Sequence, residues 1–74
     1  MSDLPVPDNR HLLRVSDADR EHVTARLREH FAEGRLTREE LDERITAALN
    51  AKTFGDLRRI MADLPGTVPG RLDP

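Results

Sequence analysis

The sequence contains no cysteine, tryptophan or tyrosine, and its only two aromatic residues are Phe31 and Phe54. Without cysteine the chain can form neither disulfide bonds nor thiolate-bound zinc sites. Any core must therefore be built mainly from aliphatic side chains. No stretch approaches the roughly 20 apolar residues of a membrane-spanning helix, and the first residues lack the basic and apolar pattern of a signal peptide. The sequence predicts a cytoplasmic protein without a membrane span.

A strong excess of one charge is also lacking. Fourteen acidic residues oppose twelve basic ones and the formal net charge is −2, which gives no general attraction to nucleic acid or acidic lipid. At 74 residues, with 36% hydrophobic and 35% charged residues, the chain is long enough for one small domain. A core of this size yields little net stability, so well-formed helices or association with a partner must supplement it.

Proline and glycine gather toward the ends of the chain and delimit a structured body. Residues 1–13 hold two prolines and are predicted to form a flexible arm. Residues 65–74 hold three prolines and two glycines, which predicts a disordered tail. Residues 14–64 show the apolar spacing of helices and no strand pattern. The predicted fold is all-α, a small three-helix unit between a flexible N-terminal arm and a Pro/Gly-rich C-terminal tail.

Capping motifs predict where the three helices begin. Ser16, Thr37 and Thr53 each stand three residues before an acidic residue, which is the spacing of a capping box. Each hydroxyl is expected to accept a hydrogen bond from the first turn of its helix, and its loss to cost about 1 kcal/mol. Gly34 is predicted to end the first helix in the left-handed conformation that glycine adopts readily.

Apolar spacing predicts the buried face of each helix. Leu36 and Leu41 flank the second cap at the spacing of a hydrophobic staple, so a tight turn should join the first two helices as antiparallel or steeply angled neighbours. The predicted core residues are Val23, Leu27 and Phe31 in the first helix, Leu41, Ile45, Ala48 and Leu49 in the second, and Leu57, Ile60, Met61 and Leu64 in the third.

Residues that could support catalysis or metal binding are few. Nucleophilic catalysis needs a side chain next to an activating base, but most serines and threonines are assigned to caps, and a body of about 50 residues should lack a cleft of several hundred Å³. His22 and His30 lie eight residues apart, roughly 12 Å along a helix, too far to share one metal ion. His22 and Arg28 also occupy positions where a calcium loop opened by Asp17 needs glycine and glutamate. The sequence predicts no enzyme, no cofactor and no metal site.

Protein binding is the favoured function. The apolar side chains outnumber those that one small core is expected to hold, and some should remain on the surface. The candidates are Leu12, Leu13, Phe54 and Ile60. We therefore expect a non-catalytic protein–protein interaction or self-association module, including a homodimer, with a marginally stable monomer as the simpler alternative.

The alternative function is that of a small helix-turn-helix-like DNA-binding protein. In that interpretation the third helix would lie in the groove, and Arg35, Arg58 and Arg59 would contact DNA. Asp56 and Asp63 flank the arginines of the third helix, and the chain lacks the basic surface expected of a DNA-binding domain. Association through apolar surface should survive high salt, whereas duplex binding should weaken steeply.

Three segments resemble a known family. They are "R-x-SDADRE" at residues 14–21, "EGRLT-x-EEL-x-ER" at residues 33–44 and "ADLP" at residues 62–65. Together they resemble the actinobacterial SHOCT-like domain of unknown function, a short module at the start of small, often membrane-associated proteins. The resemblance implies no established activity, cofactor or catalytic residue. Members usually continue into transmembrane helices or a further domain.

Charged residues within these segments suggest a specific contact. Since the first two helices pack together, we expect Arg14 or Arg44 to reach Asp17 or Asp19 across their junction; the alternative is that these charges are independently solvated. With the apolar candidates they define a predicted interaction set: Leu12, Leu13, Arg14, Asp17, Arg44, Phe54, Arg58 and Ile60.

Overall fold

The computed structural model describes residues 10–66, so most of the predicted arm and tail lies outside the described residues. Between residues 10 and 66 the chain forms helices and no strand; two residues, Arg14 and Thr53, form an isolated antiparallel bridge. The all-α prediction is confirmed. The elements are the 3₁₀ helix η1 (Arg10–Leu12) and the α-helices α1 (Asp17–Ala32), α2 (Arg38–Leu49) and α3 (Phe54–Ile60).

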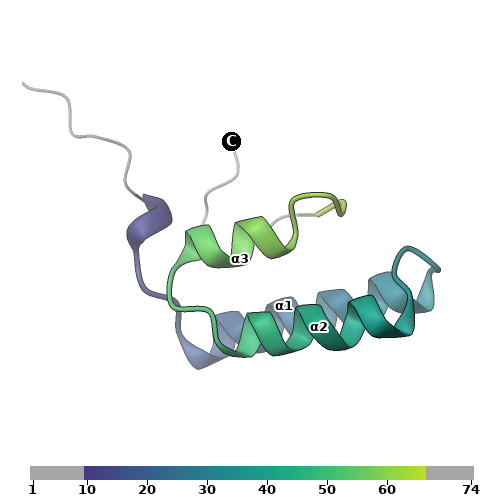
Figure 1. The fold of residues 1–74 in the computed structure, drawn as a ribbon. Helices are drawn as coiled ribbons and strands as arrows, with labels where there is room; N and C mark the ends of the chain where they lie inside the picture. The colour runs from purple at the N-terminus through teal and green to yellow at the C-terminus, as the bar shows by residue number, and fades with distance from the viewer. Residues whose placement is uncertain (1–9, 67–74) are drawn as a thin grey trace, which may run out of the picture.

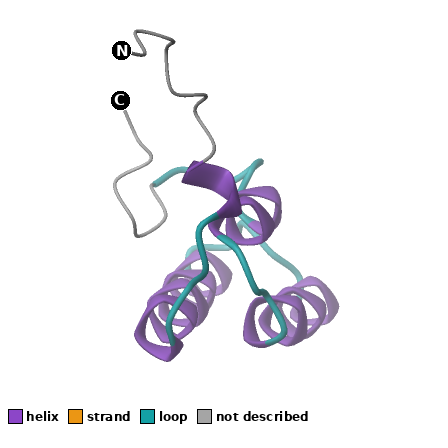
Figure 2. Ribbon diagram, turned by 90° about the vertical axis from the view of Figure 1, so that its left-hand side faces the viewer, coloured by secondary structure: helices purple, strands orange, loops and turns teal. Residues whose placement is uncertain are grey.

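The three α-helices pack as a triangle. Helices α1 and α2 lie side by side as an antiparallel hairpin, and α3 lies over the pair (Figure 1). Viewed from the end, α1 and α2 occupy two corners and α3 the third (Figure 2). The 3₁₀ helix η1 packs near the start of α3. Each helix can therefore turn one apolar stripe toward a shared core.

All three predicted capping boxes are present and explain where the helices begin. In each box the hydroxyl accepts a hydrogen bond from the backbone N–H three residues later, and the acidic side chain accepts one from the backbone N–H of the capping residue. For example, Glu40 N donates to Thr37 Oγ1 at 3.1 Å and Thr37 N donates to Glu40 Oε1 at 2.8 Å. These bonds are local, so four residues of sequence suffice to specify each box.

The turn between α1 and α2 follows the predicted glycine. Gly34 has φ of +82°, and its N–H donates to Phe31 O at 3.0 Å while Arg35 N donates to His30 O at 2.9 Å. This pair of bonds is a Schellman motif, which satisfies carbonyl groups that the end of the helix would otherwise leave unpaired. Leu36, immediately after the turn, is buried, and α2 begins two residues later, after its N-cap Thr37.

The core between the helices is aliphatic apart from one phenylalanine. Leu27 of α1 and Leu57 of α3 have no solvent exposure and belong to the same core cluster. Full burial of a side chain of this size contributes about 1.5–3 kcal/mol. The buried hydrophobic residues are Val15, Val23, Leu27, Leu36, Leu41, Ala48, Ala51, Phe54, Leu57 and Met61, with Ile45, Ile60 and Leu64 packed against them.

Two residues predicted to be in the core lie at the surface. Phe31 is 37% exposed, and its neighbour His30 is buried in the position that we expected Phe31 to fill. Leu49 is 55% exposed, while the adjacent Ala48 is fully buried. Successive residues on a helix point about 100° apart, so a shift of one position in the packed stripe is enough to exchange a large apolar side chain for a histidine or an alanine.

Candidate interaction surface

The N-terminal segment, defined here as residues 10–15, is fixed to the start of α3 by backbone hydrogen bonds. Phe54 N donates to Leu13 O at 3.0 Å, and Val15 N donates to Lys52 O at 3.0 Å. These bonds satisfy a donor at the start of α3 and a carbonyl acceptor in the preceding loop. These bonds fix the backbone of the segment, and with it the points from which its side chains extend.

Close packing of this segment depends on Gly55. A Cβ atom at position 55 would lie 3.0 Å from His11 O and 3.3 Å from His11 Cβ. A side chain here would force η1 away from α3, whereas glycine allows the two backbones to approach. The glycine therefore serves the contact between η1 and α3, even though glycine lowers helix propensity by about 1 kcal/mol relative to alanine.

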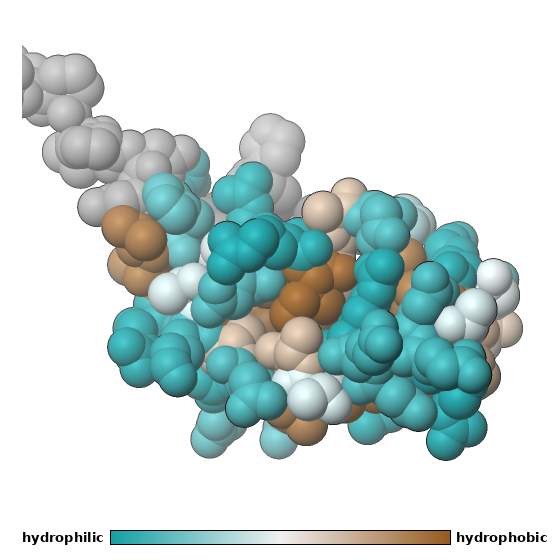
Figure 3. Space-filling model, in the orientation of Figure 1, coloured by the Kyte–Doolittle hydropathy of each residue, from teal (hydrophilic) through white to brown (hydrophobic). Residues whose placement is uncertain are grey.

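The N-terminal segment presents two leucines to solvent. Leu12 is 60% exposed and Leu13 is 53% exposed, and no residue of η1 is buried. Figure 3 shows hydrophobic side chains gathered over η1 on the face that also carries α3. We call Leu12 and Leu13 the leucine pair. Scattered surface leucines are common, but two adjacent ones on a backbone-fixed turn form a protruding apolar surface.

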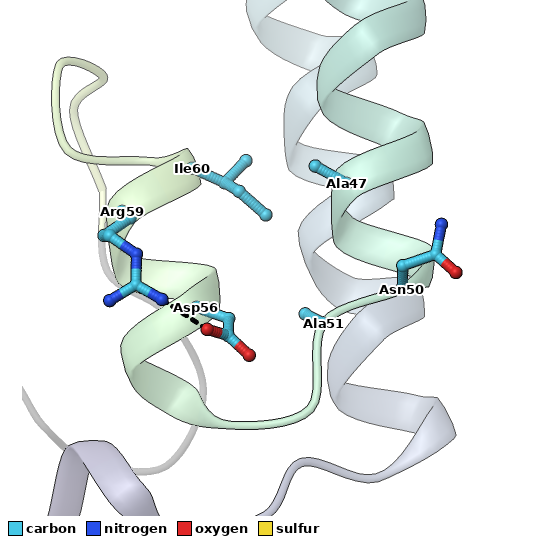
Figure 4. A pocket seen from close by; sticks show the side chains of 6 residues that line it. All are labelled: Ala47, Asn50, Ala51, Asp56, Arg59 and Ile60. Carbon is cyan, nitrogen blue, oxygen red and sulfur yellow. Dashed lines mark hydrogen bonds and ion pairs between the residues drawn. The ribbon is translucent and has the colours of Figure 1, made fainter.

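A shallow, open groove lies between α2 and α3 on the same face (Figures 3 and 4). It has a volume of about 440 Å³, and our expectation that the body leaves no room for several hundred Å³ is therefore wrong. Ile60 from α3 and Ala47 from α2 point toward one another across it, as Figure 4 shows. The alanines on α2 and in the following loop leave this space because they are small. The lining residues are Ala47, Asn50, Ala51, Asp56, Arg59 and Ile60.

Arg44 joins α2 to the end of α3. Its guanidinium donates to both carboxylate oxygens of Asp63, at 2.6 and 3.0 Å, and to the carbonyl oxygen of Ile60 at 3.0 Å. The hydrogen bond from Arg44 lowers the pKa of Asp63, and the same hydrogen bond raises the pKa of Arg44. We call this bidentate ion pair, together with its backbone contact, the Arg44 clamp. It holds the last turn of α3 against α2.

The predicted ion pair across the α1–α2 junction is wrong. Asp17 binds Arg20 on its own helix at 2.8 Å, and Asp19 forms part of the first capping box. Arg14 is exposed, and Arg44 points to the other side of α2, toward the end of α3. The physical reason is that the cap and the same-helix neighbour satisfy these two carboxylates locally.

A second arginine performs the bridging role on the α1 side. The Nε atom of Arg20 donates to Ala51 O at 2.8 Å, in the loop that follows α2. Arg20 and Arg44 each place a positive charge near the C-terminal end of another helix, where the helix dipole favours cations. Both arginines lie within the segments that carry the family resemblance, and so does Asp63. These charged residues thus connect the helices to one another.

The remaining predicted binding residues lie in different environments. Phe54 is buried and is therefore not part of the exposed apolar surface, while Ile60 is half-buried at the groove.

Of the proposed DNA contacts, Arg35 pairs with Glu33 and Arg59 pairs with Asp56. Arg58 is exposed on α3.

His30 is the buried polar residue without full hydrogen bonding. It is 2% exposed, and its Nδ1 lies 3.0 Å from a guanidinium nitrogen of Arg35. Arginine can only donate, so Nδ1 accepts and the proton of the neutral ring is on Nε2. Among residues 10–66, Nε2 has no hydrogen-bond partner. A buried donor left unpaired destabilises the fold by about 1–3 kcal/mol.

Replacing this histidine is therefore expected to stabilise the protein. His30→Leu should raise the free energy of unfolding by about 1 kcal/mol, since it removes the unpaired Nε2–H and keeps an apolar side chain in the core. Chemical denaturation followed by circular dichroism measures the change. His22→Leu, at an exposed position of the same helix, is the matched control and should change little; a loss of stability in His30→Leu would contradict this interpretation of His30.

Two kinds of site were not found in the part of the chain that the structure describes. No group of three or more histidine, cysteine, aspartate or glutamate residues is arranged to hold a metal ion within residues 10–66. No helix in that range is long and apolar enough to cross a membrane.

The fold and this surface together define a class of protein: a small all-α domain of three capped helices, joined by arginine bridges and carrying an exposed leucine pair. More specifically, the chain belongs to the family of the DUF1707 SHOCT-like domain, whose model matches residues 13–65. The family resemblance noted from the sequence is confirmed.

Relatives of the chain occur in Mycobacterium tuberculosis. An uncharacterized protein from strain CDC 1551 / Oshkosh and one from strain ATCC 25618 are each 43% identical to this chain over 51 residues. The match covers 69% of this chain and 18% of each relative, so the chain spans less than a fifth of the length of these proteins. No solved structure matches the chain.

Proposed function

We propose that this domain is a non-catalytic protein–protein interaction module that binds through the face formed by the N-terminal segment and α3. The observation that carries the proposal is the leucine pair, which is more than half exposed although the backbone beneath it is fixed to α3. A segment whose backbone is already fixed before binding loses little backbone entropy when a partner covers it. A cytoplasmic location, which the sequence predicts, is part of the same proposal.

Support for a non-catalytic role comes from the groove. Its charged residues, Asp56 and Arg59, pair with each other, and Asp56 also accepts hydrogen bonds from the backbone N–H groups of Lys52 and Thr53, which lower the pKa of Asp56. A carboxylate engaged in this way acts as a helix cap, and a general acid or base needs a free position facing substrate. The groove is thus better suited to contact with apolar groups.

DNA binding receives less support from the same geometry. Two of the three proposed contact residues, Arg35 and Arg59, already pair with acidic side chains. In a helix-turn-helix the two helices meet at about 90–120°, whereas α1 and α2 here lie side by side as an antiparallel hairpin (Figures 1 and 2). Titration of a DNA duplex over a range of salt concentrations tests this alternative, since phosphate contacts would give a steep loss of affinity with salt.

The interaction proposal predicts position-dependent crosslinking. A photoreactive amino acid at position 12 should yield covalent adducts with a protein, either another copy or a different chain, when the intact protein is illuminated in cells that express it. The same amino acid at position 28, an exposed position on α1, is the control and should yield few. Mass spectrometry of the adducts measures the difference, and equal yields at the two positions would contradict the proposal.

A further inference from the structure

The leucine pair and the groove lie on the same face of the molecule, one protruding and one hollowed (Figure 3). We propose that this face is the interface of a two-fold symmetric dimer, in which the leucine pair of each copy enters the groove of the other. The inference rests on the proposed function and names the partner as a second copy of this chain. A two-fold axis brings the same patch of both copies together. The protrusion of each copy then meets the hollow of the other, and no further copy can be added at this interface.

The groove suits aliphatic side chains in size and lining. Its volume of about 440 Å³ exceeds that of a dozen water molecules at about 30 Å³ each, which leaves room for the eight side-chain carbons of two leucines. The floor consists of Ala47, Ala51 and Ile60, all apolar. Leucines that move from water into such a space gain the hydrophobic free energy that a small core cannot supply.

The polar residues at the groove already have partners. Asp56 pairs with Arg59, and the side-chain amide of Asn50 donates to Thr46 O at 2.8 Å. Covering the apolar floor therefore leaves these groups hydrogen-bonded, and no unpaired charge is trapped. A polar border around an apolar centre is the usual arrangement of protein interfaces.

The leucine pair does not fill the groove of its own copy. Neither leucine is among the groove-lining residues, and the bond from Phe54 N to Leu13 O holds the segment at the start of α3. In this proposal the leucine pair that fills each groove therefore comes from the second copy.

Sedimentation of the full chain over a range of concentrations, at low and high salt, tests the proposal. We expect a monomer–dimer equilibrium that persists at high salt, because apolar contacts are not screened. Leu13→Glu should raise the dissociation constant at least tenfold. Leu49→Glu is the matched control, since Leu49 is equally exposed but lies two residues after Ala47 and so points to the opposite side of α2, and it should change the constant less than twofold.

A mixing experiment tests the reciprocal contact. Ala47→Arg, at an exposed position of the groove, should also weaken the dimer by filling the hollow, with helix content unchanged by circular dichroism. A mixture of Leu13→Glu and Ala47→Arg chains should associate more strongly than either alone, because one of the two junctions is intact in the mixed dimer.

Three results would overturn the proposal: a wild-type chain that stays monomeric up to roughly millimolar concentration, a dimer equally sensitive to Leu49→Glu, or no recovery on mixing. If the chain is monomeric but position 12 still crosslinks to a different protein, the interaction function stands and only the dimer is wrong. If position 12 yields no adduct, the proposed function fails as well.

Discussion

Leu27→Ala is expected to lower the free energy of unfolding by about 2–5 kcal/mol, because it leaves a cavity at the centre of the three-helix core. Leu27 has no solvent exposure and belongs to the core cluster to which all three helices contribute. The total stability of a domain this small is on the order of 5 kcal/mol, so the variant should be partly or wholly unfolded at room temperature. Urea denaturation followed by circular dichroism measures the loss.

Leu49→Ala is the control for this substitution. It removes the same atoms from a helix, but Leu49 is 55% exposed, so the change should be within about 0.5 kcal/mol. The apolar spacing of the sequence predicts both leucines to be buried, whereas the structure places only Leu27 in the core. Equal losses in the two variants would contradict the packing of α2.

Arg44→Met is expected to lower the free energy of unfolding by about 1–2 kcal/mol, since the bond from a charged donor to Ile60 O and the ion pair to Asp63 are lost together. Solvent screens the ion pair and limits its contribution, because the Arg44 side chain is 24% exposed and that of Asp63 is 65% exposed. Amide hydrogen exchange should rise mainly in α3, the helix that the Arg44 clamp holds. Arg38→Met removes an exposed same-helix pair with Asp42 and should have little effect.

Acid should weaken the Arg44 clamp in a defined direction. Since Arg44 lowers the pKa of Asp63, the stabilisation by this carboxylate is complete above the ordinary pKa that it has in the unfolded chain and is lost as the pH falls through its lower folded-state pKa. The stability difference between the wild type and Asp63→Asn should thus be full at neutral pH and vanish in acid. A double-mutant cycle should show coupling of Arg44 to Asp63 and none to Asp17; coupling to Asp17 instead would contradict the clamp.

Features that depend on a few neighbouring residues could be predicted from the sequence. The three capping boxes and the glycine turn at Gly34 are of this kind, since each partner lies within six residues along the chain. The all-α class follows from them together with the apolar spacing. Local rules of this type fix where a helix begins and ends, but they do not fix how it is rotated about its axis.

Helix rotation is where prediction from the sequence failed. The spacing of Val23, Leu27 and Phe31 is regular, yet the packed stripe of α1 continues through His30. In α2, Ala48 faces the core in place of Leu49. The rotation depends on how closely two helices approach. Small side chains such as Ala48 allow a close approach, which cannot be predicted from the spacing of hydrophobic residues alone.

The candidate site was predictable only in part. The sequence predicts the leucine pair at the surface. It also predicts that Arg44 forms an ion pair, but the partner of Arg44 in the structure, Asp63, lies nineteen residues away in sequence. Contacts of this length depend on the whole fold. The only sequence signal for this pair was that both residues lie within segments of the family resemblance. That signal does not say which residue each of them contacts. The groove was missed because its floor contains alanines, which carry no distinctive pattern.

The central claim is that the N-terminal segment is docked on α3 and presents the leucine pair as a binding surface. Amide hydrogen exchange of the full chain, read residue by residue at neutral pH, tests it most directly. The amides of Val15 and Phe54, which bond to Lys52 O and Leu13 O, should be protected to the same degree as the amides within α3. Exchange of these two amides at the rate of an unstructured peptide, with the helices still protected, would contradict the account.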